Sequence, residues 1–187
     1  MTLAQAVWPS VAPIARNAAL AIAGTLLLAI SAKMHIPFWP VPLTMQTFVV
    51  LVLGMAYGRT LGAATMLLYL VEGAIGLPVF SGTPERGIGL AYMVGPTGGY
   101  LAGFVAGAGL CGWLAEKGWD RSWWRTAVAM SLGHLVILAL GWAWLATLIG
   151  PAKAYALGVE PFYLATAAKT ALAVAALPLA WKLIPKP

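Results

Sequence analysis

Long apolar stretches alternate along the chain with short stretches rich in proline, glycine and charged residues. The apolar stretches predict six helical segments, at about residues 14–32, 43–57, 60–76, 92–115, 125–149 and 161–184. A membrane-spanning helix uses about 20 residues, so a chain of 187 residues holds these segments and leaves no room for a soluble domain. The pattern predicts an all-α, polytopic membrane protein, in which residues 1–187 form one integral membrane domain with a bundle of six transmembrane helices.

The connections between the segments differ in kind. Residues 33–42 contain three prolines, which remove backbone donors and favour extended geometry, so we expect an extended loop. The second and third segments are separated only by the neighbourhood of Gly58, which predicts a tight antiparallel hairpin. Residues 77–89 are rich in Gly, Pro and Ser and predict a second long loop.

The composition excludes several other classes of protein. Hydrophobic residues make up 61% of the chain and charged residues 9%, where a soluble chain carries about 25% charged residues. A soluble enzyme, a disordered chain and a disulfide scaffold are therefore ruled out. The net charge is +6, but the basic residues stand singly at the ends of apolar segments, which indicates membrane topology and not nucleic-acid binding. The first 15 residues lack Lys and Arg, so we expect the first segment to be a span and not a cleaved signal.

The basic residues also predict an orientation, because they concentrate on the cytoplasmic side of membrane proteins. One side would carry seven of them, namely Arg16, Arg59, Lys117, Arg121, Arg125, Lys182 and Lys186. The other side would carry three, namely Lys33, Arg86 and Lys153. We therefore expect a plasma-membrane protein with both termini in the cytoplasm and with the loops at 33–42 and 77–89 facing outward.

Lys169 is a cation inside the last predicted span. It follows Pro161 by eight residues, about 12 Å along a helix. Holding an ammonium group at that depth costs a few kcal/mol unless it has a partner or a water-filled cavity. One interpretation is a structural ion pair with Glu72, the only acidic residue within a span. The interpretation that we favour is an anion-binding site reached from outside.

Other side chains at the outer ends of the segments suit such a site. Arg86 is a second cation on that side, and its planar guanidinium group matches the geometry of a carboxylate. Aromatic residues gather there as well, and most are expected to form an interfacial belt while one or two line a pocket. These aromatic residues are Phe38, Trp39, Phe80, Tyr92, Phe162 and Tyr163.

Small residues recur every four positions in two segments. One stripe consists of Gly95, Gly99, Gly103 and Gly107, and it predicts close packing between helices. The other consists of Ala15, Ala19 and Ala23 in the first segment. The alanine stripe can serve internal packing too, but the glycine stripe already provides for that, so we expect the alanine stripe to be available to another protein.

Ser131 and His134 lie three residues apart in the fifth segment and suggest an intramembrane hydrolase. Nucleophilic catalysis requires a base in hydrogen-bond reach and an oxyanion hole. No acidic residue that would orient the base and no glycine-flanked serine accompanies them. A buried, hydrogen-bonded histidine is the favoured interpretation, and we expect no enzymatic activity, no cofactor and no metal.

Three motifs follow one another along the chain, namely KMHIPFWPVPLTMQTF at 33–48, YLVEGAIGLPVF at 69–80 and GPTGGY at 95–100. Together they closely resemble the BioY family. The resemblance runs from about residue 15 to 182. The family comprises the biotin-specific, substrate-binding S components of energy-coupling factor (ECF) vitamin transporters. The resemblance implies six membrane helices, cytoplasmic termini and a biotin site at the outward end.

The resemblance also implies roles for individual residues. Lys169 and Arg86 would neutralise the carboxylate of biotin, Thr166 and Ser81 would bind its ureido group, and Trp39 with Phe80 would cover its bicycle. Thr166 departs from the family pattern, which has an acidic residue there. A hydroxyl also accepts a hydrogen bond, but without charge assistance, so either Thr166 binds more weakly or another group such as Glu72 replaces it.

The partners follow from what the chain lacks and from the resemblance. No phosphate-binding glycine loop is present in the sequence, so energy would come from other chains. The family assembles with a transmembrane coupling protein and two ATPase subunits, and Ala15, Ala19 and Ala23 would form the docking face. An autonomous biotin facilitator, an S component for another small carboxylated vitamin, a homo-oligomer and, remotely, the hydrolase stay open as alternatives.

Overall fold

The computed structural model describes residues 2–7 and 12–183. Its helices are α1 (Leu3–Val7), α2 (Pro13–Lys33), α3 (Gln46–Tyr57), α4 (Arg59–Ala74), α5 (Gly89–Met93), α6 (Gly98–Glu116), α7 (Trp123–Ile149), α8 (Pro151–Gly158) and α9 (Phe162–Leu183). Two short strands, β1 (His35–Ile36) and β2 (Leu43–Thr44), and a 3₁₀ turn, η1 (Trp119–Arg121), complete the described structure.

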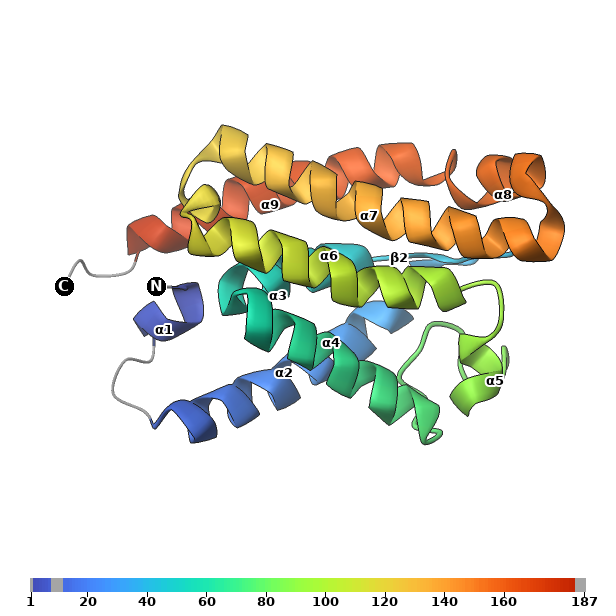
Figure 1. The fold of residues 1–187 in the computed structure, drawn as a ribbon, viewed down its shortest axis with the longest axis horizontal. Helices are drawn as coiled ribbons and strands as arrows, with labels where there is room; N and C mark the ends of the chain where they lie inside the picture. The colour runs from blue at the N-terminus through green and yellow to red at the C-terminus, as the bar shows by residue number, and fades with distance from the viewer. Residues whose placement is uncertain (1, 8–11, 184–187) are drawn as a thin grey trace.

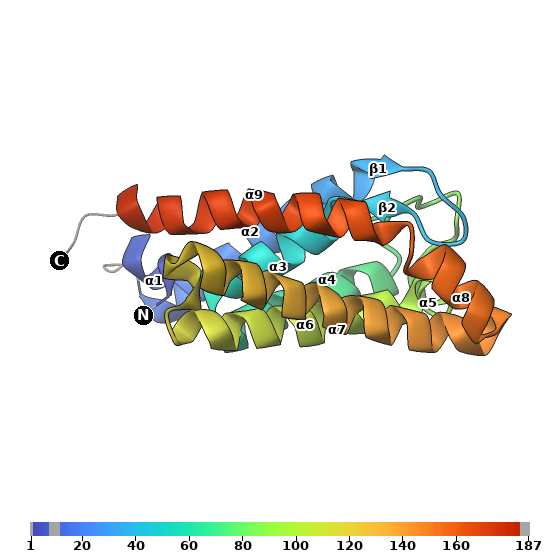
Figure 2. The ribbon, with the colours of Figure 1, turned by 90° about the horizontal axis from the view of Figure 1, so that it is seen from above.

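The long helices form a bundle, and α6 is the most buried of the four described helices that are long and apolar enough to cross a membrane. Helix α6 packs against α7, α3 and α4, while α2 packs on α4 and α3, and α9 packs on α7 and α3. Figure 2 shows α9 and the strands on one side of the bundle, α6 and α7 on the other, and α3 between them. The strands, α5 and α8 lie at one end of the bundle, and α1, η1 and the C-terminal end of α9 lie at the opposite end (Figure 1).

The predicted helical segments agree with α2, α3, α4, α6, α7 and α9 in order and in approximate position. The predicted first residues of two helices are wrong. The segment predicted at 43–57 begins with a strand, and its helix starts only at Gln46. The segment predicted at 92–115 starts at Gly98, because Pro96 disfavours helical geometry in the residue before it and separates α5 from α6. Residue 184, the predicted end of the last segment, lies outside the described residues.

The helical membrane fold is confirmed, whereas the number of spans stays a prediction. Within the described residues, α2, α6, α7 and α9 are long and apolar enough to cross a membrane. Helix α3 has 12 residues and α4 has 16, or about 18 and 24 Å of length. Each is shorter than the hydrocarbon core, which is about 30 Å thick.

The glycine stripe serves helix packing, as predicted, except for Gly95, which precedes the helix. A Cβ atom on Gly99 would lie 2.3 Å from the Leu140 carbonyl oxygen, and one on Gly103 would lie 2.8 Å from the Ile137 Cα atom. Only glycine therefore permits α6 to approach the backbone of α7 this closely. The predicted hairpin between α3 and α4 is present as well, with Gly58 as the one residue between the two helices.

The two predicted groups of basic residues lie at opposite ends of the bundle. Arg16 lies in the first turn of α2, and Arg59 is the first residue of α4. Lys117 follows α6, and Arg121 belongs to η1. Arg125 and Lys182 lie in the first turn of α7 and the last turn of α9, at the same end (Figure 1). Lys33, Arg86 and Lys153 belong to elements of the other end, and Lys186 lies outside the described residues. The grouping agrees with the expected topology, and the compartment that each end faces stays a prediction.

Candidate functional site

Two loops form the mouth of a cavity at the end of the bundle that carries the strands. We call residues 34–45, between α2 and α3, the first pocket loop, and residues 75–88, between α4 and α5, the second pocket loop. The first contains an antiparallel hairpin in which His35 pairs with Thr44 and Ile36 with Leu43. The sequence indicated extended geometry here but not the pairing, because two-residue strands are too short to show a period of two.

Phe80 anchors the second pocket loop in the core. Its side chain is 1% exposed, meets Tyr69 edge to face at 5.4 Å between ring centroids and stacks on Tyr92 at 4.9 Å. A Cβ atom on Gly73 would lie 2.0 Å from the Phe80 ring, so the loop can approach α4 here only because residue 73 is glycine. The Tyr69 hydroxyl donates to the Val79 carbonyl at 2.7 Å. Aromatic packing and this bond therefore hold the loop in place.

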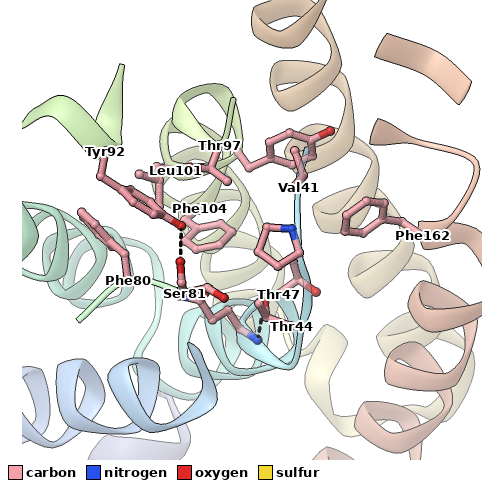
Figure 3. A pocket seen from close by; sticks show the side chains of 13 residues that line it. Val41, Thr44, Thr47, Phe80, Ser81, Tyr92, Thr97, Leu101, Phe104 and Phe162 are labelled. Atoms are coloured by element: carbon pink, nitrogen blue, oxygen red, sulfur yellow. Dashed lines mark hydrogen bonds between the residues drawn. The ribbon is translucent and has the colours of Figure 1, made fainter. Parts of the chain in front are cut away.

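The cavity lies beneath the two loops, and Figure 3 shows its side chains around a common space, with Phe162 on one side and Phe80, Ser81 and Tyr92 on the other. It contains about 440 Å³ of space not occupied by atoms, counting its open mouth. Its lining combines aromatic and aliphatic groups with hydroxyls and one amide. The lining residues are Val41, Pro42, Thr44, Gln46, Thr47, Phe80, Ser81, Tyr92, Thr97, Tyr100, Leu101, Phe104 and Phe162.

The Ser81 hydroxyl is a buried, unsatisfied polar group of this lining. The side chain is 2% exposed, and its Oγ atom has no hydrogen-bond partner among the residues that the structure describes. The backbone carbonyl of Ser81 accepts a hydrogen bond of 2.8 Å from the Tyr92 hydroxyl. Burial raises the pKa of Tyr92, so that hydroxyl stays protonated and remains a donor. An unpaired buried hydroxyl costs free energy, and a ligand with a hydrogen-bonding group can remove that cost.

Lys169 lies behind the wall of the cavity. Its side chain is 5% exposed, and its Nζ atom donates a hydrogen bond of 3.0 Å to Oγ1 of Thr47, a lining residue. Among the residues that the structure describes, Lys169 forms no ion pair with Glu72, which removes the alternative of a structural pair between them. A neutral hydroxyl does not compensate a buried ammonium charge, so an anionic ligand would supply the missing charge.

The other predicted ligand residues occupy different surroundings. Thr166 lies on α9 one turn before Lys169 and is half-buried, but it does not line the cavity. Trp39 is 68% exposed. Arg86 is exposed too, and its guanidinium group donates to the carbonyls of Pro40 and Phe38. The structure thus brings Ser81 and Phe80 into the cavity and Lys169 against its wall, while Thr166, Trp39 and Arg86 lie outside the lining.

The predicted buried histidine is confirmed. His134 is 2% exposed, and its Nδ1 atom lies 2.9 Å from the carbonyl oxygen of Met130. Ser131 is exposed, and no hydrogen bond joins it to His134 in the described part of the chain. The arrangement required for nucleophilic catalysis is therefore not formed by this pair.

Several lining residues had not been singled out from the sequence. Thr44, Gln46 and Thr47 lie at the junction of β2 and α3, and the Gln46 amide donates to the Tyr69 hydroxyl at 2.7 Å. Thr97 lies just before α6, and Tyr100 lies in its first turn. All five belong to the motifs at 33–48 and 95–100. Their position inside the motifs was the feature of the sequence that could have identified them as lining residues.

Comparison with known proteins identifies the family. The sequence matches the description of the BioY family over residues 3–186. The chain belongs to the BioY family. The predicted resemblance is thereby confirmed across nearly the whole BioY chain, and a multi-pass membrane protein follows from the family together with the apolar helices.

Individual relatives of this BioY chain cover most of its length. A "probable biotin transporter BioY" from Pyrococcus horikoshii is 36% identical over 160 residues, which are 86% of this chain and 93% of the relative. A "biotin transporter BioY" from Thermotoga maritima is 40% identical over 117 residues, or 63% of this chain and 66% of the relative. A crystal structure of the S component for biotin from an ECF-type ABC transporter superposes with a TM-score of 0.77 at 22% identity, covering 90% of this chain and 92% of the other. That likeness establishes the fold.

Proposed function

We propose that this BioY chain captures biotin in the cavity beneath the two pocket loops and takes part in biotin uptake as the S component of an ECF transporter. The names of its relatives support a biotin transporter, and the fold of a biotin S component supports the role within an ECF complex. A membrane transporter of this family is not an enzyme, which agrees with the geometry of Ser131 and His134.

The observation that carries the proposal is the combination of chemical groups in one cavity. Biotin has an apolar bicycle, a ureido group with two donors and one acceptor, and a carboxylate. The cavity has aromatic rings, hydroxyl and amide groups that include the unpaired Ser81 Oγ, and an ammonium group behind Thr47 that lacks an acidic partner in the described chain. Apolar cavities with a few convergent polar groups are the usual form of small-molecule sites.

The individual roles follow from position. Phe80 would cover the bicycle, and Ser81 would bind the ureido group. Lys169 would attract the carboxylate, with Thr47 as the wall residue between them. Thr166, one turn before Lys169 on α9, would reach the ureido group only if the ligand moves the side chains around it. Trp39 would contact the ligand only from the rim, because its ring is largely exposed.

The partner proposal concerns the opposite half of α2. Ala15, Ala19 and Ala23 are all exposed, and small side chains permit the backbone of another membrane helix to approach closely. We propose that this face docks on the ECF coupling protein, with ATPase subunits supplying the energy. Both termini would then lie in the cytoplasm and the pocket would face outward, as the basic residues indicate.

The first test is binding of radiolabelled biotin by the purified full-length chain in detergent. Binding is expected for the parent chain, and Lys169→Ala should weaken it roughly ten- to hundredfold, because a charge-assisted contact is worth about 1.5 to 3 kcal/mol. Lys153→Ala, which removes an exposed cation of α8 at the same end, is the matched control and should bind as the parent does. Failure of the folded parent to bind biotin would contradict the proposal.

A second test concerns the position at which the family carries an acidic residue. If Thr166 takes over that role, Thr166→Asp should retain or tighten biotin binding, and Thr166→Val should weaken it because a methyl group cannot accept a hydrogen bond. Equal affinity of Thr166→Val and the parent for biotin would mean that another residue recognises the ureido group. Ser81 is then the next residue to substitute.

A further inference from the structure

Two cations beside the cavity bind the pocket loops instead of pointing into the cavity. Lys33, the last residue of α2, donates from Nζ to the carbonyls of Phe80 at 3.2 Å and Thr83 at 3.1 Å, and to Oγ1 of Thr83 at 3.2 Å. Arg86 donates from Nη1 to the Pro40 carbonyl at 3.3 Å and from Nη2 to the Phe38 carbonyl at 3.1 Å. Each cation therefore joins segments that are far apart in the sequence.

The hydrogen bonds of Lys33 and Arg86 join the two pocket loops in opposite directions across the boundary between them, which we call the seam. Lys33 precedes the first pocket loop and holds the second, whereas Arg86 belongs to the second and holds the first. The residues they hold adjoin or belong to the cavity lining. Val41 and Pro42 follow directly after Pro40, and Phe80 is itself a lining residue next to Ser81. Opening the seam would therefore move lining residues on both sides of the mouth.

The packing of the Arg86 stem shows that this arrangement is built into the loop. A Cβ atom on Gly82 would lie 2.7 Å from Cδ of Arg86 and 3.1 Å from its Cγ. Gly82 also has a φ of +73°, a conformation that other residues rarely adopt. Glycine at this position leaves the path free along which the arginine reaches the first loop. The planar guanidinium group then donates from two separate nitrogens, Nη1 and Nη2, to the carbonyls of Pro40 and Phe38.

We propose that Lys33 and Arg86 are positioning residues that clasp the two pocket loops together, and that they determine how long a bound ligand stays without contacting it. We call this pair the loop clasp. The inference rests on the proposed function for its ligand. It differs from the expectation that Arg86 neutralises the carboxylate, because the clasp holds any ligand of suitable shape, charged or not.

The decisive experiment compares two ligands that differ only in charge. The dissociation rates of biotin and of biotinamide, which has an uncharged amide in place of the carboxylate, are measured on the purified parent chain, Arg86→Met, Arg86→Lys and Lys33→Met. Arg86→Met and Lys33→Met should release both ligands faster by a similar factor, roughly three- to tenfold for the loss of two or three hydrogen bonds at a partly exposed site. Arg86→Lys should release both ligands more slowly than Arg86→Met does, because an ammonium group can still donate to one of the two carbonyls.

Two control variants separate the clasp from other effects of charge. Lys153→Gln removes an exposed cation from α8 and should leave both dissociation rates unchanged. Lys169→Ala should weaken binding of biotin far more than that of biotinamide, as expected for a group that attracts the carboxylate. If Arg86→Met affected biotin alone, Arg86 would contact the carboxylate and the clasp would be overturned. Unchanged release of both ligands would overturn it as well.

A measurement without ligand keeps the clasp testable should the parent chain bind neither compound. Hydrogen–deuterium exchange of two hydrogen-bonded amides reports on the pocket loops: the Met45 amide, which donates to the Met34 carbonyl at 3.1 Å in the first loop, and the Gly87 amide, which donates to the Pro84 carbonyl at 2.9 Å in the second. Exchange should be faster in Arg86→Met than in the parent and in Lys153→Gln. Equal exchange in all three would reject the clasp, whereas faster exchange without biotin binding would support the clasp and reject only the proposed function.

Discussion

Helices α6 and α2 both carry a row of small residues, and they use it in opposite ways. The glycines of α6 face the backbone of α7, and 61% of the most apolar stretch of α6 is buried in the bundle, against 22% for α2. The alanines of α2 at positions 15, 19 and 23 are exposed, and α2 attaches to its neighbours through another face, with Gly24, Thr25, Leu28, Ser31 and Ala32 buried.

The difference shows that a row of small residues indicates close helix packing but does not identify the helix that packs against it. Small side chains permit close approach of two helices wherever they occur. They do not say whether the second helix belongs to the same chain. In α6 the approach is so close that a methyl group would collide with backbone atoms. The alanine face of α2 has its methyl groups in place, and its alanines are exposed among the residues that the structure describes.

Gly103→Ala should have the largest effect on stability. The new methyl group would lie 2.8 Å from Cα and 3.2 Å from the carbonyl oxygen of Ile137, and backbone atoms in the middle of a long helix cannot move aside separately. Overpacking of this kind costs about 1 to 3 kcal/mol or more. We expect a sharply lower yield of monodisperse protein and a strongly lowered Tm in detergent. A Tm equal to that of the parent would show that α6 and α7 are packed less closely than described.

Ala19→Trp should leave Tm and biotin binding unchanged and abolish assembly with the coupling protein. The indole group would occupy the space that a second helix needs, without disturbing the buried face of α2. Co-purification with the coupling protein and ATP-dependent uptake into liposomes are the measurements. Ile14→Trp is the matched control, because Ile14 is 86% exposed on another side of the same helix end. Normal assembly of Ala19→Trp, or loss of biotin binding, would assign the alanine row to another role.

Gly24→Ala should have an intermediate effect on stability. Its methyl group would lie 2.7 Å from Cγ2 of Thr65, 3.3 Å from the Tyr57 ring and 3.4 Å from Cδ1 of Leu53, which are all side-chain atoms. Side chains can shift by a few tenths of an ångström, and alanine favours the helix by about 1 kcal/mol over glycine. A lowering of Tm by a few degrees is expected, smaller than for Gly103→Ala. The reverse order of the two variants would mean that α2 is held more rigidly than α6.

Gly109→Ala should have the smallest effect and the opposite sign. The nearest atom to its new methyl group would be Cβ of Ala63 at 3.9 Å, an ordinary contact. Replacing a helical glycine at a compatible site stabilises by about 0.4 to 1 kcal/mol, so Tm should rise slightly. A clear loss of stability would show that this face of α6 also requires glycine.

The position and type of the long helices were predictable, because apolar runs leave few alternatives in a membrane. The short elements were not. Helices α1 and α8 and the pairing of β1 with β2 were missed, since five or eight residues carry too little periodicity. The fourth segment was predicted to start too early, because the prediction continued the helix across Gly95 and Pro96. The residue before a proline disfavours helical geometry, and the structure has no helix between α5 and α6 at these positions.

The candidate site was predictable in part. Phe80 and Ser81 line the cavity, and Lys169 supports its wall. Phe80 ends the motif at 69–80 and Ser81 follows it, whereas Lys169 was singled out as a cation inside a span. That these residues bind a ligand stays a prediction. Arg86 was expected to bind a ligand because it is a cation near the outward loops. Its actual partners are carbonyl oxygens 46 and 48 residues away in the chain, and a sequence pattern does not indicate which backbone atoms such a side chain will meet.

The sequence by itself determined that this is a helical membrane protein of the BioY family, because apolar length, scarcity of charge and motif order are all local properties of the chain. Only the tertiary structure decided which row of small residues is buried, which cation supports the cavity and which cations join its loops. The physical reason is that each of these depends on the atoms of a distant segment. Whether a side chain meets backbone, lipid or a ligand is settled when helices pack, and not by its neighbours in the sequence.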